Sequence, residues 1–136
     1  MAKEFINPPN LPSWEQSFSQ IVVVSNGTSK TIYISGQVAV DEGHNLVGEG
    51  DLSVQAMLVF QNVETALAAA GARTSDVVKL NIYVKGYQPP DGILVGEALR
   101  KYFPHKALPA STWLGVQSLA KEGFLIEVDA VAVVEQ

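Results

Sequence analysis

The sequence predicts an α+β fold: a mostly antiparallel, mixed sheet with two helices packed on one of its faces. Five segments alternate apolar and polar residues as β-strands do, while only two segments repeat apolar residues with helical spacing. One set of alternate strand residues is largely apolar, and two helices suffice to cover only one side of a sheet of five or six strands. The chain has 136 residues, which suits a single domain.

The N-terminal part of the chain predicts a leader followed by a hairpin. We expect residues 1–16 to form an extended leader, because "INPPNLPS" contains three prolines. Strands are expected at 19–25 and 31–40. Asn26-Gly27 lies between them, and this dipeptide favours a tight hairpin turn. Residues 41–51, with three glycines, are then expected to form a loop.

The remaining elements follow from two helical stripes and three β-type runs. The first helix begins near Ser53, with Asp51 or Ser53 as its cap and Gly71 at its end. Its apolar stripe comprises Ala56, Val59, Phe60, Val63, Ala66, Leu67 and Ala70. A strand at 76–86 precedes a second helix that Pro89-Pro90-Asp91 opens, and the last strands are expected at 109–117 and 124–134.

The sheet face away from the helices is expected to be both polar and aromatic. Alternation places Tyr33, Tyr83, Trp113 and Leu125 there, whereas Gly36 and Thr112 fall on the helix side. Exposing this many apolar side chains to solvent is unfavourable, and apolar patches of this kind mark interaction surfaces. We therefore predict a homo-oligomer that joins these faces, with pockets where subunits meet.

Composition and charge exclude several classes of function. The net charge of −5 argues against nucleic-acid binding, and the absence of cysteine excludes disulfides and thiol nucleophiles. The two histidines, His44 and His105, lack metal-binding spacing, so we expect no metal and no cofactor. The first ten residues lack the apolar core of a signal peptide, and no apolar run is long enough to span a bilayer. We expect a cytoplasmic protein without a membrane partner.

Five short motifs, in their order and spacing, resemble the RidA/YjgF (Rid) family. They are "SGQV" at 35–38, "ALAAAGA" at 66–72, "DVVKLNIYVKG" at 76–86, "LPAS" at 108–111 and "IEVDAVAV" at 126–133. The resemblance runs from about Ser17 to Val134. It implies a chorismate-mutase-like fold, a single Rid-type domain over residues 1–136, and a homotrimer with clefts for a small-molecule ligand between subunits.

The resemblance also implies a site. In deaminating members of the family, water attacks the carbon of a small enamine or imine and ammonia leaves. The acidic residue that orients the water corresponds to Glu127, and the "SGQ" backbone places Gly36 in the cleft. A tyrosine of the family corresponds to Phe18, its carboxylate-binding arginine to Ser111, and a cysteine of some members to Trp113. Serine cannot form the bidentate pair that a guanidinium makes with a carboxylate.

Each candidate residue has a structural alternative. Glu127 is either a partly desolvated catalytic acid or one half of an interface ion pair. Trp113 either stacks on a planar ligand or anchors a subunit interface, and Ser111 either donates to a ligand or bonds a neighbouring backbone group. Gly36 either admits a ligand or allows close packing under a helix. Tyr87 either covers the cleft or lies on a loop surface.

Three functions follow from these alternatives. The first is hydrolytic deamination of reactive enamine or imine metabolites, with Glu127 positioning water and ammonia released. The second is a non-catalytic, small-ligand-binding or chaperone-like trimer that has lost the deaminase arginine. The third is ribonuclease activity or inhibition of translation, which the acidic charge disfavours. The sequence leaves open whether the protein is an enzyme.

Overall fold

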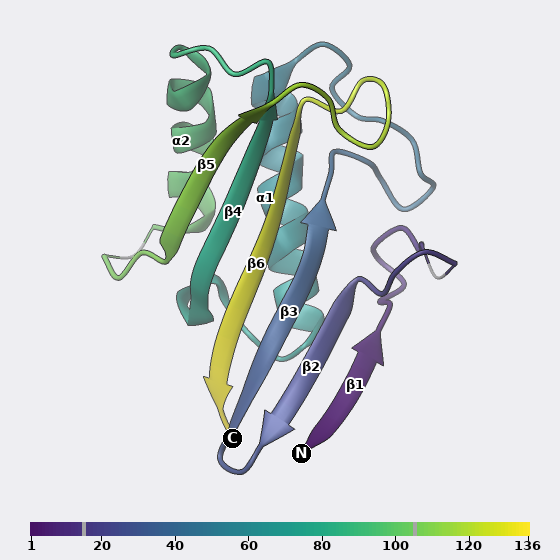
Figure 1. Cartoon of the computed structure of the whole chain (residues 1–136), viewed down its shortest axis with the longest axis vertical. Helices are drawn as coiled ribbons and strands as arrows, with labels where there is room; N and C mark the ends of the chain where they lie inside the picture. Colours follow the sequence, from purple (N-terminus) through teal and green to yellow (C-terminus); the bar gives the residue numbers. More distant parts are fainter. Residues whose placement is uncertain (15, 105) are drawn as a thin grey trace.

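Across residues 1–14, 16–104 and 106–136, which a computed structural model describes, the chain folds into one six-stranded sheet and two α-helices (Figure 1). The strands are β1 (Ala2–Ile6), β2 (Ile21–Asn26), β3 (Ser29–Gln37), β4 (Val77–Lys85), β5 (Ala110–Val116) and β6 (Ile126–Glu135). The helices are α1 (Leu52–Ala69) and α2 (Asp91–Tyr102), with a 3-10 turn, η1, at Thr74–Asp76. The α+β class is confirmed. His105, one of the histidines considered above, lies outside the described residues.

The sheet is mixed, as predicted. Its strand order is β1-β2-β3-β6-β4-β5, in which β4 and β5 pair in parallel and the other neighbours pair antiparallel. Parallel neighbours require a crossover connection, and α2 supplies it between β4 and β5. β1 and β5 therefore form the two edges of the sheet (Figure 1).

The predicted leader is wrong for the first residues of the chain. Ala2–Ile6 forms strand β1, which pairs with β2 from Ala2↔Ser25 to Ile6↔Ile21. The prolines lie after Ile6 and leave this strand free to pair. The segment was missed because "AKEFI" is short and mostly exposed, so that it carries no apolar alternation.

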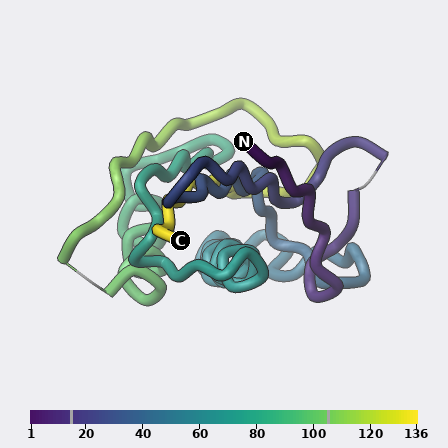
Figure 2. Tube along the Cα trace, turned by 90° about the horizontal axis from the view of Figure 1, so that it is seen from below, coloured from purple at the N-terminus to yellow at the C-terminus, as the bar shows by residue number. Residues whose placement is uncertain are grey.

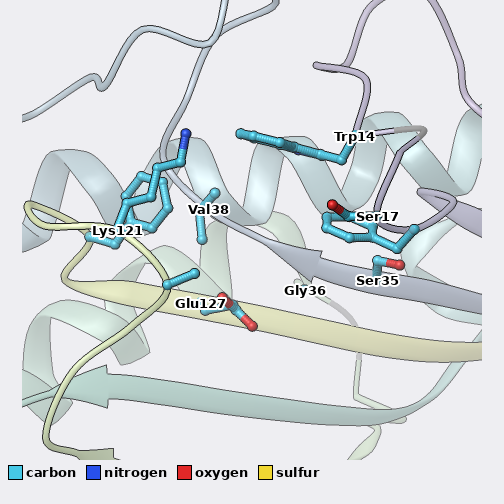
Figure 3. Close-up of a pocket in the computed structure, with 10 residues that line it drawn as sticks. Trp14, Ser17, Ser35, Gly36, Val38, Lys121 and Glu127 are labelled. Atoms are coloured by element: carbon cyan, nitrogen blue, oxygen red, sulfur yellow. The ribbon is translucent and has the colours of Figure 1, made fainter.

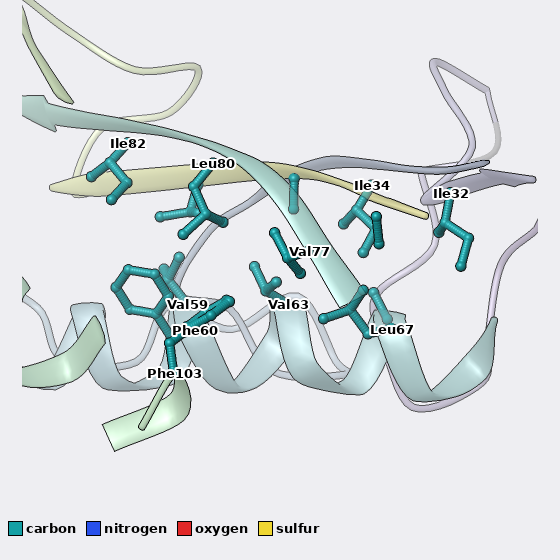
Figure 4. Close-up of a cluster of buried hydrophobic side chains, with 14 of the residues drawn as sticks. Ile32, Ile34, Val59, Phe60, Val63, Leu67, Val77, Leu80, Ile82 and Phe103 are labelled. Atoms are coloured by element: carbon teal, nitrogen blue, oxygen red, sulfur yellow. The ribbon is translucent and has the colours of Figure 1, made fainter. Parts of the chain in front are cut away.

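The core lies between α1 and one face of the sheet. Asp51 caps α1 by accepting a hydrogen bond from the Val54 N–H at 3.1 Å, and the helix ends before Gly71, whose φ is +76°. The apolar stripe of α1 packs on β3, β4 and β6 (Figure 4). Both helices lie on the same side of the sheet (Figure 2), as predicted. In the described part of the chain, neither helix combines the length and apolarity needed to cross a membrane.

A β-bulge interrupts β3 and reverses the faces of its last residues. Ile34 pairs with Ala130 and Gln37 pairs with Val128, so three steps along β3 match two along β6. Strict alternation places Gly36 on the helix side and Gln37 on the opposite face. That prediction is wrong: the bulge buries Gln37 and turns Gly36 toward Glu127.

Candidate functional site

A pocket of about 530 Å³ lies where β3 ends and β6 begins (Figure 3). Three segments line it: the connection from β1 to β2, the end of β3, and the loop from β5 to β6 together with the first residues of β6. The lining residues are Trp14, Ser17, Phe18, Ser35, Gly36, Val38, Ala120, Lys121, Phe124 and Glu127. This volume falls in the range of pockets that hold small molecules.

Glu127 lies directly against the backbone of Gly36 at the floor of the pocket (Figure 3). A Cβ on Gly36 would overlap the carboxylate oxygen Oε2 and would lie 2.9 Å from Cγ of Glu127. Any side chain at this position would therefore displace the Glu127 carboxyl group. The bulge in β3 and the missing side chain of Gly36 together allow the Glu127 carboxyl group to lie against the β3 backbone.

Glu127 and Asp129 are neighbours on one face of β6 but have different surroundings. Burial raises the pKa of Glu127, and the negative charge of Asp129 raises it further. Asp129 accepts a hydrogen bond from the Asn81 side-chain amide at 2.8 Å and another from the Tyr83 hydroxyl. Burial is the main cause that raises the pKa of Tyr83, and the negative charge of Asp129 raises it further, so this phenol keeps its proton. Glu127 thus occupies the desolvated position, where the protonated form of the carboxyl group is favoured more than in an ordinary glutamate.

Replacing Asp129 by asparagine is expected to lower the pKa of Glu127. The substitution removes the negative charge that raises this pKa, but it keeps an oxygen that accepts the Asn81 hydrogen bond. A ¹³C NMR titration of the Glu127 carboxyl carbon measures the change. Glu135→Gln, which removes a charge at the exposed far end of the same strand, is the control and is expected to have little effect. An unchanged pKa in Asp129→Asn would contradict this account.

An aromatic group closes one side of the pocket. The rings of Trp14 and Phe18 stack, with their centroids 6.2 Å apart and their planes 25° apart. The His44 ring meets the Trp14 ring edge-on, with the two ring centroids 4.4 Å apart, and the Lys121 ammonium lies 4.9 Å from the Trp14 ring centroid. Trp14 is therefore held by an aromatic partner, an imidazole and a cation, and it forms a fixed planar wall.

Gln55, fully buried on α1, holds the loop that carries part of the pocket wall. Its side-chain amide donates to the carbonyls of Gly48 and Gly123 at 3.0 and 2.9 Å, and its carbonyl accepts from the Leu125 N–H at 2.9 Å. One side chain thus bonds three backbone groups, of which the Gly48 carbonyl also accepts from the Asp51 N–H. The loop from β5 to β6, which bears Lys121, is fastened to the helix in this way.

Asn62, two turns further along α1, holds the other wall. Its side-chain amide donates to the carbonyls of Val38 and Val40 at 3.1 and 3.3 Å. Val38 lines the pocket, so the segment after β3 is fixed by the same helix that fixes the loop before β6. Two buried amides on the otherwise apolar buried face of α1 thus position the pocket walls.

Replacing Gln55 by leucine is expected to destabilise the protein by about 2 kcal/mol, because it leaves the Gly123 carbonyl and the Leu125 N–H without this partner, while the Gly48 carbonyl keeps the Asp51 N–H. Urea unfolding measures this change in free energy. Gln61→Leu, at an exposed position on the same helix, is the matched control and is expected to change stability by less than about 0.5 kcal/mol. Equal stability of the two variants would show that Gln55 does not hold the loop.

The structure brings together three of the six predicted site residues. Phe18, Gly36 and Glu127 all line the pocket. Their convergence fits the predicted site, although they come from three segments that are far apart in the sequence. Their roles toward a ligand remain predictions.

Ser111 and Trp113 lie elsewhere in the same chain. In the parallel pair, Trp113 lies beside Ile82, which is buried on the helix side, whereas Glu127 pairs with Tyr83 on the open side. The expectation that Trp113 and Glu127 share one face is therefore wrong. Alternation shows which residues of one strand share a face. The register between two strands decides which residues of the second strand lie on that same face. The Trp113 indole N–H donates to the Ser111 hydroxyl at 2.7 Å.

Two further residues of this region are displaced from their predicted places. Thr112 lies on the open face rather than the helix side, where its hydroxyl meets the Lys79 ammonium at 2.7 Å. Tyr87 is no lid over the pocket within this chain. Its Cβ and hydroxyl lie where a side chain at Gly115 and at Gly92, respectively, would have to go, which places Tyr87 between β5 and α2.

Sequence reasoning missed most of the pocket wall. Trp14 lies in a proline-rich connection, and Lys121 lies in a loop without a motif, so neither position carried a periodic signal. A lone tryptophan in a polar segment was the one available sign. Within the described residues, no three metal-ligating side chains gather in one place.

Comparison with known proteins shows the family. The model of the family described as endoribonuclease L-PSP matches residues 9–134. A 2-iminobutanoate/2-iminopropanoate deaminase of Dermatophagoides farinae is 30% identical, over 98% of both chains. A protein of that name from Bos taurus is 29% identical, over 98% of this chain and 91% of its own length.

Solved structures agree with this assignment. A protein of the conserved Rid family from Yersinia pestis, described as of unknown function, superimposes with a TM-score of 0.85. The two are 28% identical, and the match covers 98% of this chain and 100% of the other. The chain belongs to the RidA/YjgF family, whose family model is the one described as endoribonuclease L-PSP.

Proposed function

We propose that the protein hydrolyses a small enamine or imine to a carbonyl compound and ammonia. The observation that carries this proposal is the placement of Glu127, a carboxyl group desolvated against Gly36 at the floor of a pocket. The names of two relatives, both 2-iminobutanoate/2-iminopropanoate deaminases, support the reaction class.

The chemistry needs one group that moves a proton. An enamine first tautomerises to its imine. Water then attacks the carbon of the protonated imine as the Glu127 carboxylate takes a proton from the water, and the C=N electron pair passes to nitrogen to give a neutral carbinolamine. Glu127 next gives this proton to the amino nitrogen; the C–N bond breaks as the hydroxyl oxygen forms the carbonyl, and the hydroxyl proton passes through the Glu127 carboxylate to the released ammonia, which leaves as ammonium. A raised pKa makes the Glu127 carboxylate a stronger base than an ordinary glutamate, and the same side chain then returns the proton as an acid.

We propose that the protein works as a homotrimer, in which β5 of a neighbouring copy completes the pocket. Exposed apolar side chains on the open face of the sheet support this, notably Tyr33 and Leu114, each 49% exposed. Because β5 is an edge strand, the proposed assembly would place it, with its Ser111 and Trp113 pair, beside the Glu127 pocket of another copy. Sedimentation equilibrium should give three times the 14.6 kDa chain mass, and a monomer would contradict the assembly.

The direct test is ammonia release. Reactive enamines are generated in situ by a pyridoxal-phosphate lyase, and ammonia is measured with and without the protein. We expect the protein to accelerate release well beyond the uncatalysed rate. Release at the uncatalysed rate for aliphatic and aromatic enamines alike would contradict the proposed reaction.

A second function is favoured by one observation. The position where the family resemblance places a carboxylate-binding arginine is Ser111, and in this chain its hydroxyl is bonded to Trp113. A protein that binds small metabolites without turnover fits this substitution. Calorimetric binding of a planar acid combined with ammonia release at the uncatalysed rate would support this function over the first.

A further inference from the structure

The pocket has a cationic residue at one end and an acidic residue at the other. Among the described residues that line it, Lys121 is the one cation and Glu127 is the one acid. In Figure 3, Lys121 lies near Trp14, whereas Glu127 lies below, beside Gly36 and Ser35. A nearby ammonium would lower the pKa of Glu127, whereas burial and then Asp129 raise it and no lowering by Lys121 acts on it, as is expected for separate charged ends.

The Lys121 ammonium is available to a ligand. Its contact in the described part of the chain is the face of the Trp14 ring, at 4.9 Å, and no carboxylate there lies within salt-bridge distance of it. An ammonium has three donors, and an aromatic face engages only one side of it. The ring therefore holds the cation in place while N–H groups remain free to meet an anion in the pocket.

The walls beside this cation are flat. Trp14 and Phe18 are nearly parallel, and Phe124 and Val38 also line the pocket. The accessible lining is mainly apolar, and the volume of about 530 Å³ is larger than a three- or four-carbon imino acid requires. Stacking on fixed rings favours planar, conjugated molecules over short aliphatic ones.

We infer that Lys121 is the carboxylate-binding residue of this pocket and that Trp14 is its stacking wall. The site then prefers the enamine or imine of an aromatic amino acid to that of a small aliphatic one. The reaction rests on the proposed function: a 2-imino-3-arylpropanoate plus water gives the aryl 2-oxo acid plus ammonia. The binding preference, by contrast, holds whether or not turnover occurs.

The test uses unreactive probes. Cinnamate is flat, carries a carboxylate and resembles the aromatic enamine without its amino group. Cinnamamide has the same shape without the charge, and crotonate has the charge without the ring. Calorimetric titration is expected to give a Kd for cinnamate at least tenfold lower than for either of the others.

Two matched variants separate the lysine from a general charge effect. Lys121→Met keeps an unbranched side chain of similar length but removes its charge, and it is expected to abolish the preference for cinnamate over cinnamamide. Lys101→Met removes a cation that lies 5.6 Å from the Tyr102 ring on α2, away from the pocket, and it should leave the preference unchanged. Trp14→Leu should weaken the binding of both cinnamate and cinnamamide, because both probes lose the ring on which they stack.

Each result decides the inference independently of turnover. Binding of cinnamate and cinnamamide with equal Kd, binding of neither, or an unchanged preference in Lys121→Met would overturn it. If the protein binds cinnamate as expected but releases no ammonia, the result contradicts the proposed reaction and supports the carboxylate-binding site at Lys121. If it is active, Lys121→Met should raise KM for aromatic imino acids at nearly constant kcat.

Discussion

Replacing Glu127 by glutamine is expected to slow ammonia release by about 10²–10⁴-fold, the usual contribution of a positioned general acid–base group. Glutamine retains the size of the side chain, and the neighbouring Gly36 still leaves room for it. The amide can neither take a proton from water nor return one to ammonia. Ammonia release under identical enamine supply measures the effect, with Glu135→Gln on the same strand as the control.

The stability of this variant separates catalysis from a structural ion pair. Because the folded-state pKa of Glu127 is raised, this group contributes stability below its unfolded pKa and loses it as pH rises through the folded value. At pH 7, Glu127→Gln should therefore be at least as stable as the wild type in urea unfolding. A clear loss of stability at pH 7 with unchanged activity would instead identify Glu127 as half of a structural ion pair.

The pH profile of the wild type follows from the same shift. The attacking water needs Glu127 in its carboxylate form, so the rate should fall as pH drops through the raised pKa. The decrease in rate on the acidic side is expected at a higher pH than the pKa of an ordinary glutamate. Asp129→Asn should move this decrease to lower pH. A limb at the ordinary glutamate value would show that the desolvation seen at this residue does not govern the reaction.

Elements with strong local signals were predictable from the sequence. The apolar stripe of α1, its Asp51 cap and the Asn26-Gly27 hairpin each depend on neighbours within a few residues. β1 was not predictable because an exposed edge strand carries no apolar alternation, and its pairing with β2 is a tertiary contact. Similarly, the bulge before Gln37 leaves no mark in the alternation of β3.

The site was predictable only where a motif marked it. Gly36 and Glu127 belong to segments that resemble the family, and they meet in the structure. The faces of Ser111 and Trp113 depended on how β5 registers with β4, which alternation within one strand does not determine. Lys121 reaches the pocket through a loop that a buried glutamine holds, so its position depends on distant residues.

Gly36→Ala is the second large effect we expect, a loss of about 10²-fold in the rate of ammonia release. The added methyl group would overlap Oε2 of Glu127 and lie 2.9 Å from its Cγ, so the carboxyl group must move. A displacement of about 1 Å at a reacting group costs about this factor. Gly36 has no positive φ, so the backbone itself accepts alanine and the protein should remain folded. The rate loss and the urea unfolding curve are measured on the same preparation.

A control and a double variant make this prediction specific. Gly96→Ala on α2 places a methyl group 3.1 Å from the flexible, exposed Arg100 guanidinium, and it should leave activity unchanged. If Gly36 acts only by making room for the carboxyl group, the two changes cannot be additive. Gly36→Ala combined with Glu127→Gln should then be no slower than Glu127→Gln alone. Additive losses would mean that the backbone at Gly36 contacts the substrate itself, and full activity of Gly36→Ala would mean that the reaction does not depend on where the Glu127 carboxyl group lies.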